Sequence, residues 1–196
     1  MATKFDVFVS YRHAPDIGDW MAIFHTTLET WIQRETTIQA NVFRDKPSIA
    51  AGDEWSEAIK TALSTSRILI AVLTPTYFTS KWCVAEWRTI EQKEATHESA
   101  RNQLIIPVKF SNGHHYPDFV RKRQFDDELT DFRVVNNPII PPKSERHALL
   151  VEKVKALAVL VAERLQSVQV QDSDCLVDPD TVLLPNLPSS PTNPTP

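Results

Sequence analysis

The chain has 196 residues, 42% of them hydrophobic, which suits one domain with a buried core and a short appendage. Its formal net charge of -4 gives no bulk attraction to nucleic acid or to an anionic membrane, so neither is expected as a partner. No apolar run approaches the roughly 20 residues that span a bilayer, no signal-peptide core is evident, and two cysteines suggest no disulfide framework, so we expect a cytoplasmic protein.

Strands and helices are predicted to alternate up to residue 110. The strand predictions depend on β-branched and aromatic runs, and the helix predictions depend on apolar residues at helical spacing. Pro107 lies inside the last strand, which indicates an edge position or a strand end. We expect strands at 5–10, 40–43, 67–73 and 104–110 and helices at 16–34, 55–64 and 81–95. Asp16 is the expected N-cap of the first helix.

The segment after residue 111 carries weaker signals. We expect a short helix within 118–129, a short strand at Val134-Val135, and a long helix over 144–167 with Ser144 as its N-cap. From Gln171 onward the composition shifts to scattered aspartates and then to an end rich in Pro, Ser and Thr over 185–196, and such a segment cannot bury enough apolar surface to offset the entropy of ordering. The sequence therefore predicts a domain over 1–168 and a disordered tail or linker over 169–196.

The alternation predicts an α/β fold with a flavodoxin-like, doubly wound and mostly parallel sheet flanked by helices. In such sheets the ligand crevice lies at the carboxyl ends of the strands. The chain has three isolated glycines, so a phosphate-binding loop is absent, and no cluster of metal-ligating side chains is evident. The strand ends instead carry Ser10-Tyr11-Arg12-His13, Phe43-Arg44 and Thr74-Pro75.

A helical pair, Trp82 and Glu86, follows the third of these strand ends. Four residues apart on a helix, the two side chains share one face. An aromatic plane beside a carboxylate near a strand end can hold a nucleotide-like ligand. The competing interpretation makes Trp82 a core residue and Glu86 a solvated one, and the pair by itself does not decide between them.

Three segments in order resemble the TIR (Toll/interleukin-1 receptor) domain family. Residues 5–11 resemble its first signature box, and Phe43-Arg44-Asp45 through Gly52 resembles its BB loop. The strand 67–73, followed by Ser80-Lys81-Trp82-Cys83-Val84-Ala85-Glu86, resembles its third strand and αC helix. The resemblance covers residues 5–110 and implies the flavodoxin-like fold already predicted.

The resemblance also implies an activity. TIR enzymes cleave the glycosidic bond between nicotinamide and ribose in NAD⁺ and carry a glutamate on αC, the position of Glu86 here. We therefore expect an NAD⁺ hydrolase or cyclase, with Glu86 as the catalytic residue, no metal, and NAD⁺ as substrate rather than cofactor. The residues expected to bind NAD⁺ are Ser10, Tyr11, Arg12, His13, Phe43, Arg44, Trp55 and Trp82.

Structural interpretations of several of these residues stay open. Arg12 and His13 suit an exposed loop, Phe43 suits the core, and Trp55 suits the core or an anchor for the loop. Cys83, beside Trp82, suits a small buried residue better than a nucleophile.

The family further implies activation by self-association through the BB loop, here with Ile49 among small residues of 46–52, in immune-type signalling such as anti-phage defence. Two alternatives remain. One is a non-catalytic TIR scaffold or virulence adaptor that acts by TIR–TIR binding, and the other is a flavodoxin-like nucleotide-binding protein without catalysis. The sequence does not distinguish ADP-ribose, cyclic ADP-ribose or an isomer as the product.

Overall fold

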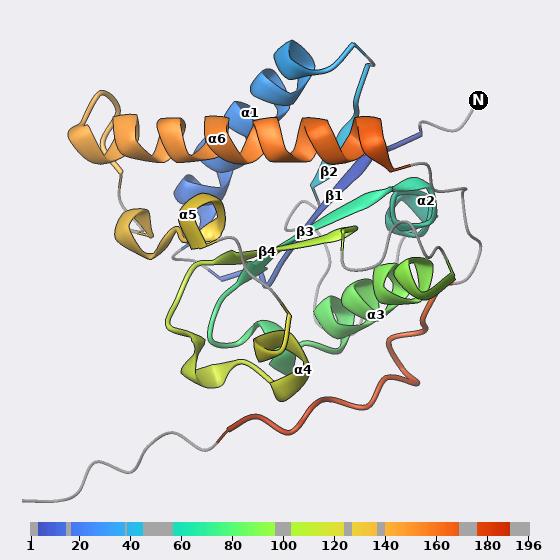
Figure 1. Ribbon diagram of the computed structural model, residues 1–196. Helices are drawn as coiled ribbons and strands as arrows, with labels where there is room; N and C mark the ends of the chain where they lie inside the picture. The colour runs from blue at the N-terminus through green and yellow to red at the C-terminus, as the bar shows by residue number, and fades with distance from the viewer. Residues whose placement is uncertain are drawn as a thin grey trace, which may run out of the picture.

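A four-stranded parallel sheet forms the centre of the molecule, with helices on both faces (Figure 1). The computed structural model describes residues 4–14, 17–37, 39–44, 57–96, 103–123, 127–136, 140–168 and 176–188. Its strands are β1 (Val7–Tyr11), β2 (Val42–Arg44), β3 (Ile68–Leu73) and β4 (Ile105–Lys109), in the order β2-β1-β3-β4. The α/β fold with a parallel, doubly wound sheet is therefore confirmed.

The register of the sheet explains why β1 and β3 are so apolar. Val7 of β1 pairs with Val42 on one side and Ile68 on the other, so β1 lies inside the sheet. All six residues of β3 are buried, as expected for a strand covered on both faces. Pro107 lies in β4, at the end of the strand order, where its missing N–H interrupts no further strand of the described sheet.

One face of the sheet is covered by α1 (Gly18–Glu35) and α6 (Glu145–Ser167), which pack against each other (Figure 1). Alternate strand residues point to this face, where they meet an apolar stripe on each helix and form a first hydrophobic cluster. Buried members of this first cluster include Val7, Val9, Ile70, Trp20, Phe24, Val154, Leu157 and Val161. Among the described residues no helix, α6 included, is both long and apolar enough to cross a membrane.

The opposite face is covered by α2 (Glu57–Thr65) and α3 (Lys81–Thr96), which enclose a second hydrophobic cluster. A short 3-10 helix, η1 (Tyr77–Thr79), joins β3 to α3 and packs in the same layer. In β1 the alternation sends Phe8 and Ser10 to this face, while Val7, Val9 and Tyr11 point to the other. Ser10 is therefore directed at the layer that contains α3.

The strand predicted at Val134-Val135 is wrong, because these residues lie in a 3-10 helix, η4 (Arg133–Val135). In the described part of this segment, pairing with β4 is limited to one isolated β-bridge, between Lys109 and Asp131. The Asp131 carboxylate then accepts hydrogen bonds from the Arg133 N–H at 3.0 Å and from its Nε at 2.9 Å, which favours a turn. Val134 is 63% exposed, so a β-branched side chain here has no sheet face to fill.

The polar segment before η4 contains more structure than the sequence predicted. It carries η3 (Gly113–His115) and two short helices, α4 (Asp118–Arg121) and α5 (Asp127–Thr130). The long helix α6 begins where predicted, and Ser144 is confirmed as its N-cap, because its side chain accepts a hydrogen bond from the His147 N–H at 3.1 Å. The predicted cap Asp16 of α1 lies outside the described residues.

Residues 176–188 fall within the stretch for which the composition predicts disorder, yet they run along α3 (Figure 1). The Val177 N–H donates to Thr89 Oγ1 at 3.0 Å, and Asp180 forms an ion pair with Lys81. We call residues 176–188 the C-terminal strap. Apolar side chains spaced among its prolines pack against the second cluster, namely Leu176, Val177, Val182 and Leu187.

Candidate functional site

The Glu86 side chain lies at the carboxyl end of β1. Ser10 Oγ donates a hydrogen bond to Glu86 Oε2 at 2.5 Å, across the layer between the sheet and α3. Glu86 is 7% exposed and Ser10 is 1% exposed. A carboxylate at this depth, near an edge where parallel strands end, is placed as a ligand-binding group would be in a doubly wound sheet. The structure therefore brings the first strand end and the α3 glutamate into direct contact.

Tyr77 joins this contact and was not predicted. Its hydroxyl lies 2.6 Å from Ser10 Oγ and 3.4 Å from the Cys83 carbonyl oxygen, a second and more distant acceptor. Burial, followed by the nearby Cys83 and Glu86, raises the pKa of the Tyr77 hydroxyl well above its ordinary value. The phenol therefore keeps its proton and acts as a neutral donor.

The position of Tyr77 could have been found from the sequence only in part. It follows Thr74-Pro75-Thr76, at the third strand end, where the ligand crevice of this fold is expected. That place along the chain is a signal for a site residue. Its inward direction is set by the η1 turn, which local sequence does not specify.

Cys83 is a buried free thiol beside the same network. Burial and the Glu86 charge, in that order, raise the pKa of the thiol above its ordinary value. Because the thiolate rather than the thiol is the nucleophile, a raised pKa and burial both disfavour a nucleophilic role for Cys83. Its structural interpretation is the one that the described geometry supports.

Arg12 lies just beyond the end of β1 and bridges to η1. Its guanidinium donates to the Thr76 carbonyl at 3.1 Å and to Thr79 Oγ1. Arg12 is partly exposed, and its charge acts on the Cys83 thiol, which places it at the same edge as the Glu86 network. The structure thus brings a cation to the sheet edge that carries the buried carboxylate.

Tyr11 points to the face of the sheet opposite to that of Ser10, and its ring contacts that of His13. Their rings stack with centroids 4.6 Å apart and an interplanar angle of 9°. Tyr11 belongs to the first cluster, on the face covered by α1 and α6, whereas His13 is exposed. The alternation along β1 separates Tyr11 from its neighbour Ser10, a consequence of strand geometry that adjacency in the sequence conceals.

Phe43 and Arg44 lie at the end of β2. Phe43 packs with Phe5 and Phe8, with ring centroids 5.0 and 5.1 Å apart, and so serves the second cluster. Arg44 is partly buried and lies close enough to His25 of α1 for its charge to help lower the pKa of that imidazole, for which burial is the main cause.

Two tryptophans, Trp82 and Trp55, are among the residues expected to bind NAD⁺. Trp82 is partly buried against the second cluster, and the Lys81 ammonium lies 5.1 Å from the centre of its ring. Trp55, together with the BB loop at 46–52, lies outside the described residues. Within the part of the chain that the structure describes, no group of three or more His, Cys, Asp or Glu side chains could hold a metal ion.

The arrangement offers one buried carboxylate, two buried hydroxyls and one cation at a single edge of the sheet. The carboxylate can stabilise a positive charge that develops beside it, and the guanidinium can pair with an anion. A ligand with a cationic centre and a phosphate group would match both.

Comparison with known proteins gives the family. The family model of the TIR domain matches residues 7–134. No curated protein matches the chain. Among solved structures, the chain is similar to the TIR domains in a structure of the activated Roq1 resistosome directly recognizing the pathogen effector XopQ, with 21% identity, 79% of this chain and 83% of that chain covered, and a TM-score of 0.41. Because the family model spans more than half of the sequence, the chain belongs to the TIR domain family.

Proposed function

We propose that this chain is a cytoplasmic TIR enzyme that cleaves the nicotinamide–ribose bond of NAD⁺ and acts in immune-type signalling. The observation that supports it best is the buried Glu86 carboxylate, which accepts a hydrogen bond from the Ser10 hydroxyl at 2.5 Å and lies at the carboxyl edge of the sheet. Family membership supports the proposal as well, because a glutamate at this place on the helix is the residue that TIR enzymes use.

The proposed chemistry needs one carboxylate. As the glycosidic bond breaks, nicotinamide departs with the bonding electron pair and the anomeric carbon gains positive charge. Glu86 stabilises that charge and accepts hydrogen bonds from the ribose hydroxyls. Nicotinamide leaves as a neutral ring, because its nitrogen is cationic in NAD⁺, so no general acid is required.

The product depends on which nucleophile completes the reaction. Attack by water gives ADP-ribose and releases one proton, whereas attack by an adenine nitrogen of the same molecule gives a cyclic product. Both routes use the same cationic intermediate and the same carboxylate. The proposal therefore covers a hydrolase and a cyclase.

Arg12 is proposed to bind the pyrophosphate. In the structure its guanidinium is held by two neutral oxygens, of Thr76 and Thr79, beside the Glu86 network. Phosphate oxygens are stronger partners for a guanidinium, so the substrate can displace these two contacts. The other residues expected to bind NAD⁺ stay proposed parts of the pocket, namely Tyr11, His13, Phe43, Arg44, Trp55 and Trp82. Ser10 is proposed to act through Glu86, since it is buried against that carboxylate.

The deciding experiment is incubation of concentrated protein with NAD⁺, followed by chromatographic separation of the products. Glu86→Gln and Glu86→Ala are expected to lower nicotinamide release by about a hundredfold or more, since they remove the charge that stabilises the intermediate. Glu91→Gln is the matched control on the same helix, because Glu91 pairs with Arg88 at the surface and is expected to leave turnover unchanged.

Thermal unfolding of each variant shows whether the fold survives the substitution. Unchanged turnover in a folded Glu86→Gln protein would sink the assignment of the catalytic residue. If concentrated wild-type protein consumes no NAD⁺, the chain is a non-catalytic TIR scaffold instead, and binding to other TIR domains becomes its activity.

A further inference from the structure

A buried hydroxyl pair lies behind the Glu86 carboxylate. We propose that Tyr77 is a positioning residue, which fixes the orientation of the Glu86 carboxylate through the Ser10 hydroxyl. The effect of this positioning on turnover rests on the proposed function, whereas the hydrogen-bonded chain of Tyr77, Ser10 and Glu86 is a property of the fold.

The direction of the two hydrogen bonds follows from the number of protons. The Ser10 hydroxyl donates its single proton to Glu86 Oε2 at 2.5 Å. Ser10 Oγ can then only accept at its other contact, and Tyr77, at 2.6 Å, is the donor. Burial raises the pKa of the phenol, so Tyr77 keeps its proton and stays the donor in the order Tyr77 to Ser10 to Glu86.

The phenol ring of Tyr77 is fixed in place by aromatic packing. Its ring is 0% exposed and packs edge-to-face with Phe78, with centroids 4.8 Å apart. Phe78 in turn contacts Trp87, the residue after Glu86, at 5.6 Å between ring centroids. The hydroxyl is thereby fixed relative to the helix that carries the carboxylate.

Loss of the Tyr77 hydroxyl would act on Ser10 first. Without the Tyr77 hydroxyl, Ser10 Oγ would no longer accept a hydrogen bond, so its own proton would no longer be directed only at Glu86. The bond from Ser10 to Glu86 would also lose the polarisation that a hydrogen-bonded chain provides. The carboxylate would then sample orientations that do not face the ribose. Since Tyr77 is fully buried, substrate binding itself is not expected to change.

The kinetic test compares two tyrosine variants. Tyr77→Phe is expected to lower kcat about tenfold, the size of one hydrogen bond in a chain that ends on a charged group, with KM for NAD⁺ unchanged. Ser10→Ala breaks the same chain in its middle and is expected to do the same. The control is Tyr116→Phe, which removes the hydroxyl of another buried tyrosine, one that donates to the Ser111 carbonyl at 3.0 Å.

The second test needs no turnover. The test is a double-mutant cycle measured by urea unfolding. The factor by which Tyr77→Phe raises the equilibrium constant of unfolding is expected to be about ten times smaller in a Glu86→Ala background than in the wild type. Tyr116→Phe is expected to have the same effect in both backgrounds. If Tyr77→Phe does not fold, the cycle of Ser10→Ala with Glu86→Ala replaces it.

The outcomes separate this proposal from the proposed function. Additive effects in the cycle overturn the positioning role, and so does an unchanged kcat of Tyr77→Phe in an active enzyme. Non-additive effects in a protein that consumes no NAD⁺ support the positioning of Glu86 and overturn the enzymatic function instead.

Discussion

Two buried glutamates on α3 have different surroundings. The carboxylate of Glu94 is surrounded by structural partners: Oε1 accepts from the backbone N–H groups of Leu104 and Ile105 at 2.8 and 3.1 Å, and Oε2 pairs with Arg123. Glu94 thus ties α3 to the start of β4 and to the residues after α4. Glu86 instead lies at the opposite, carboxyl end of the strands, where the ligand crevice of a doubly wound sheet is expected.

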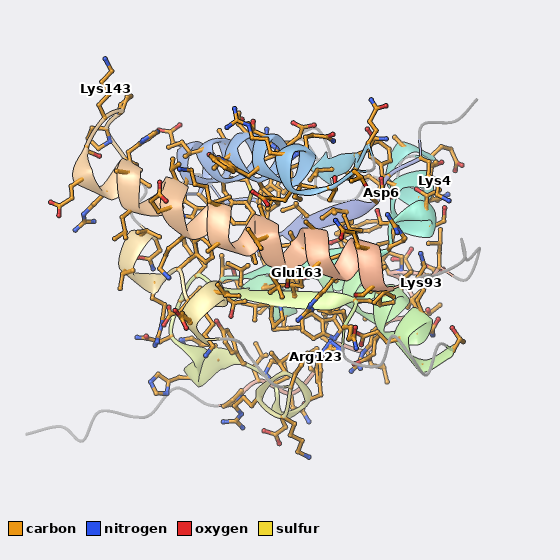
Figure 2. The ribbon with its side chains drawn as sticks, turned by 45° about the horizontal axis from the view of Figure 1, so that its top comes forward. Lys4, Asp6, Lys93, Arg123, Lys143 and Glu163 are labelled. Atoms are coloured by element: carbon orange, nitrogen blue, oxygen red, sulfur yellow. The ribbon has the colours of Figure 1, made fainter. Side chains whose placement is uncertain are left out.

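Lys93, next to Glu94, has a comparable structural role. Its ammonium donates to the carbonyl oxygens of Leu63, Ser64 and Ser66 at 3.0, 2.7 and 3.0 Å, at the end of α2. These carbonyls include groups that a helix end leaves without an internal partner. Figure 2 shows Lys93 and Arg123, which lie on the side of the sheet that carries α3.

The pH dependence of stability is expected to report on Glu94. Burial raises the pKa of its carboxyl, and Arg123 with the two N–H groups opposes that rise. A carboxyl whose pKa is higher in the folded than in the unfolded protein contributes stability below its unfolded pKa, and this contribution is lost as pH rises through the folded pKa. Arg123→Met should therefore destabilise the protein by about 3–5 kcal/mol at neutral pH, with part of the loss recovered on acidification.

Urea unfolding between neutral and mildly acidic pH measures this effect. Methionine keeps the contact with the Trp87 ring, over which the Arg123 guanidinium lies at 5.5 Å, so lost packing contributes little. Adding Glu94→Gln should remove the pH dependence, because the amide oxygen still accepts from the backbone. An equal loss of stability at every pH would contradict the role assigned to Arg123.

Among the elements, the C-terminal strap covers the outer side of α3. The strap is expected to stabilise the domain through the apolar side chains that pack against the second cluster. Leu187→Asp should lower the free energy of unfolding by about 1–2 kcal/mol, since Leu187 packs against the second cluster. Leu183→Asp is the matched control, because Leu183 is 90% exposed and its change should stay within about 0.5 kcal/mol.

Equilibrium unfolding of the two variants and the wild type gives the comparison. Equal stability of Leu187→Asp and Leu183→Asp would mean that the strap adds nothing to the folded domain. A larger loss for Leu187→Asp would place the strap within the cooperative unit rather than in a linker.

The elements that sequence predicted well are those with long, regular patterns. The continuous apolar run of β3 and the helical stripe of α6 are each unambiguous, and both elements were predicted almost to their ends. Val134-Val135 was mispredicted because two β-branched residues suit a strand locally, whereas the Asp131 carboxylate and the missing sheet face favour a turn. The strap was not predicted because its leucines and valines are too sparse to outweigh a proline-rich composition.

The candidate site was predictable in the same uneven way. The proximity of Glu86 to Ser10 follows from the order of strands and helices, since the ends of parallel strands meet at one edge of the sheet. Tyr77 was missed because its direction depends on a turn. Tyr11 points to the face away from Glu86, because the alternation of a strand separates residues that are adjacent in the sequence. The expected roles of the NAD⁺-binding residues stay predictions.

For the whole molecule, the proposed enzyme is expected to depend on self-association. If neighbouring protomers complete the site, the rate of nicotinamide release per protomer should rise with protein concentration, by mass action. Measurement of specific activity across a dilution series, alongside sedimentation, checks this expectation. Ile49→Asp, in the BB loop outside the described residues, should weaken the rise, whereas constant specific activity at every concentration would contradict activation by association.

The pairing of α1 with α6 has a consequence for the order in which the protein becomes stable. One face of the sheet is covered only when residues 145–167 pack beside residues 18–35, and the second edge of β1 is paired only when β3 is present. During synthesis from the N-terminus, the apolar side of α1 therefore stays open to solvent until almost the whole domain has left the ribosome. Such long-range pairing makes folding slow and leaves the nascent chain in need of protection from aggregation until α6 is made.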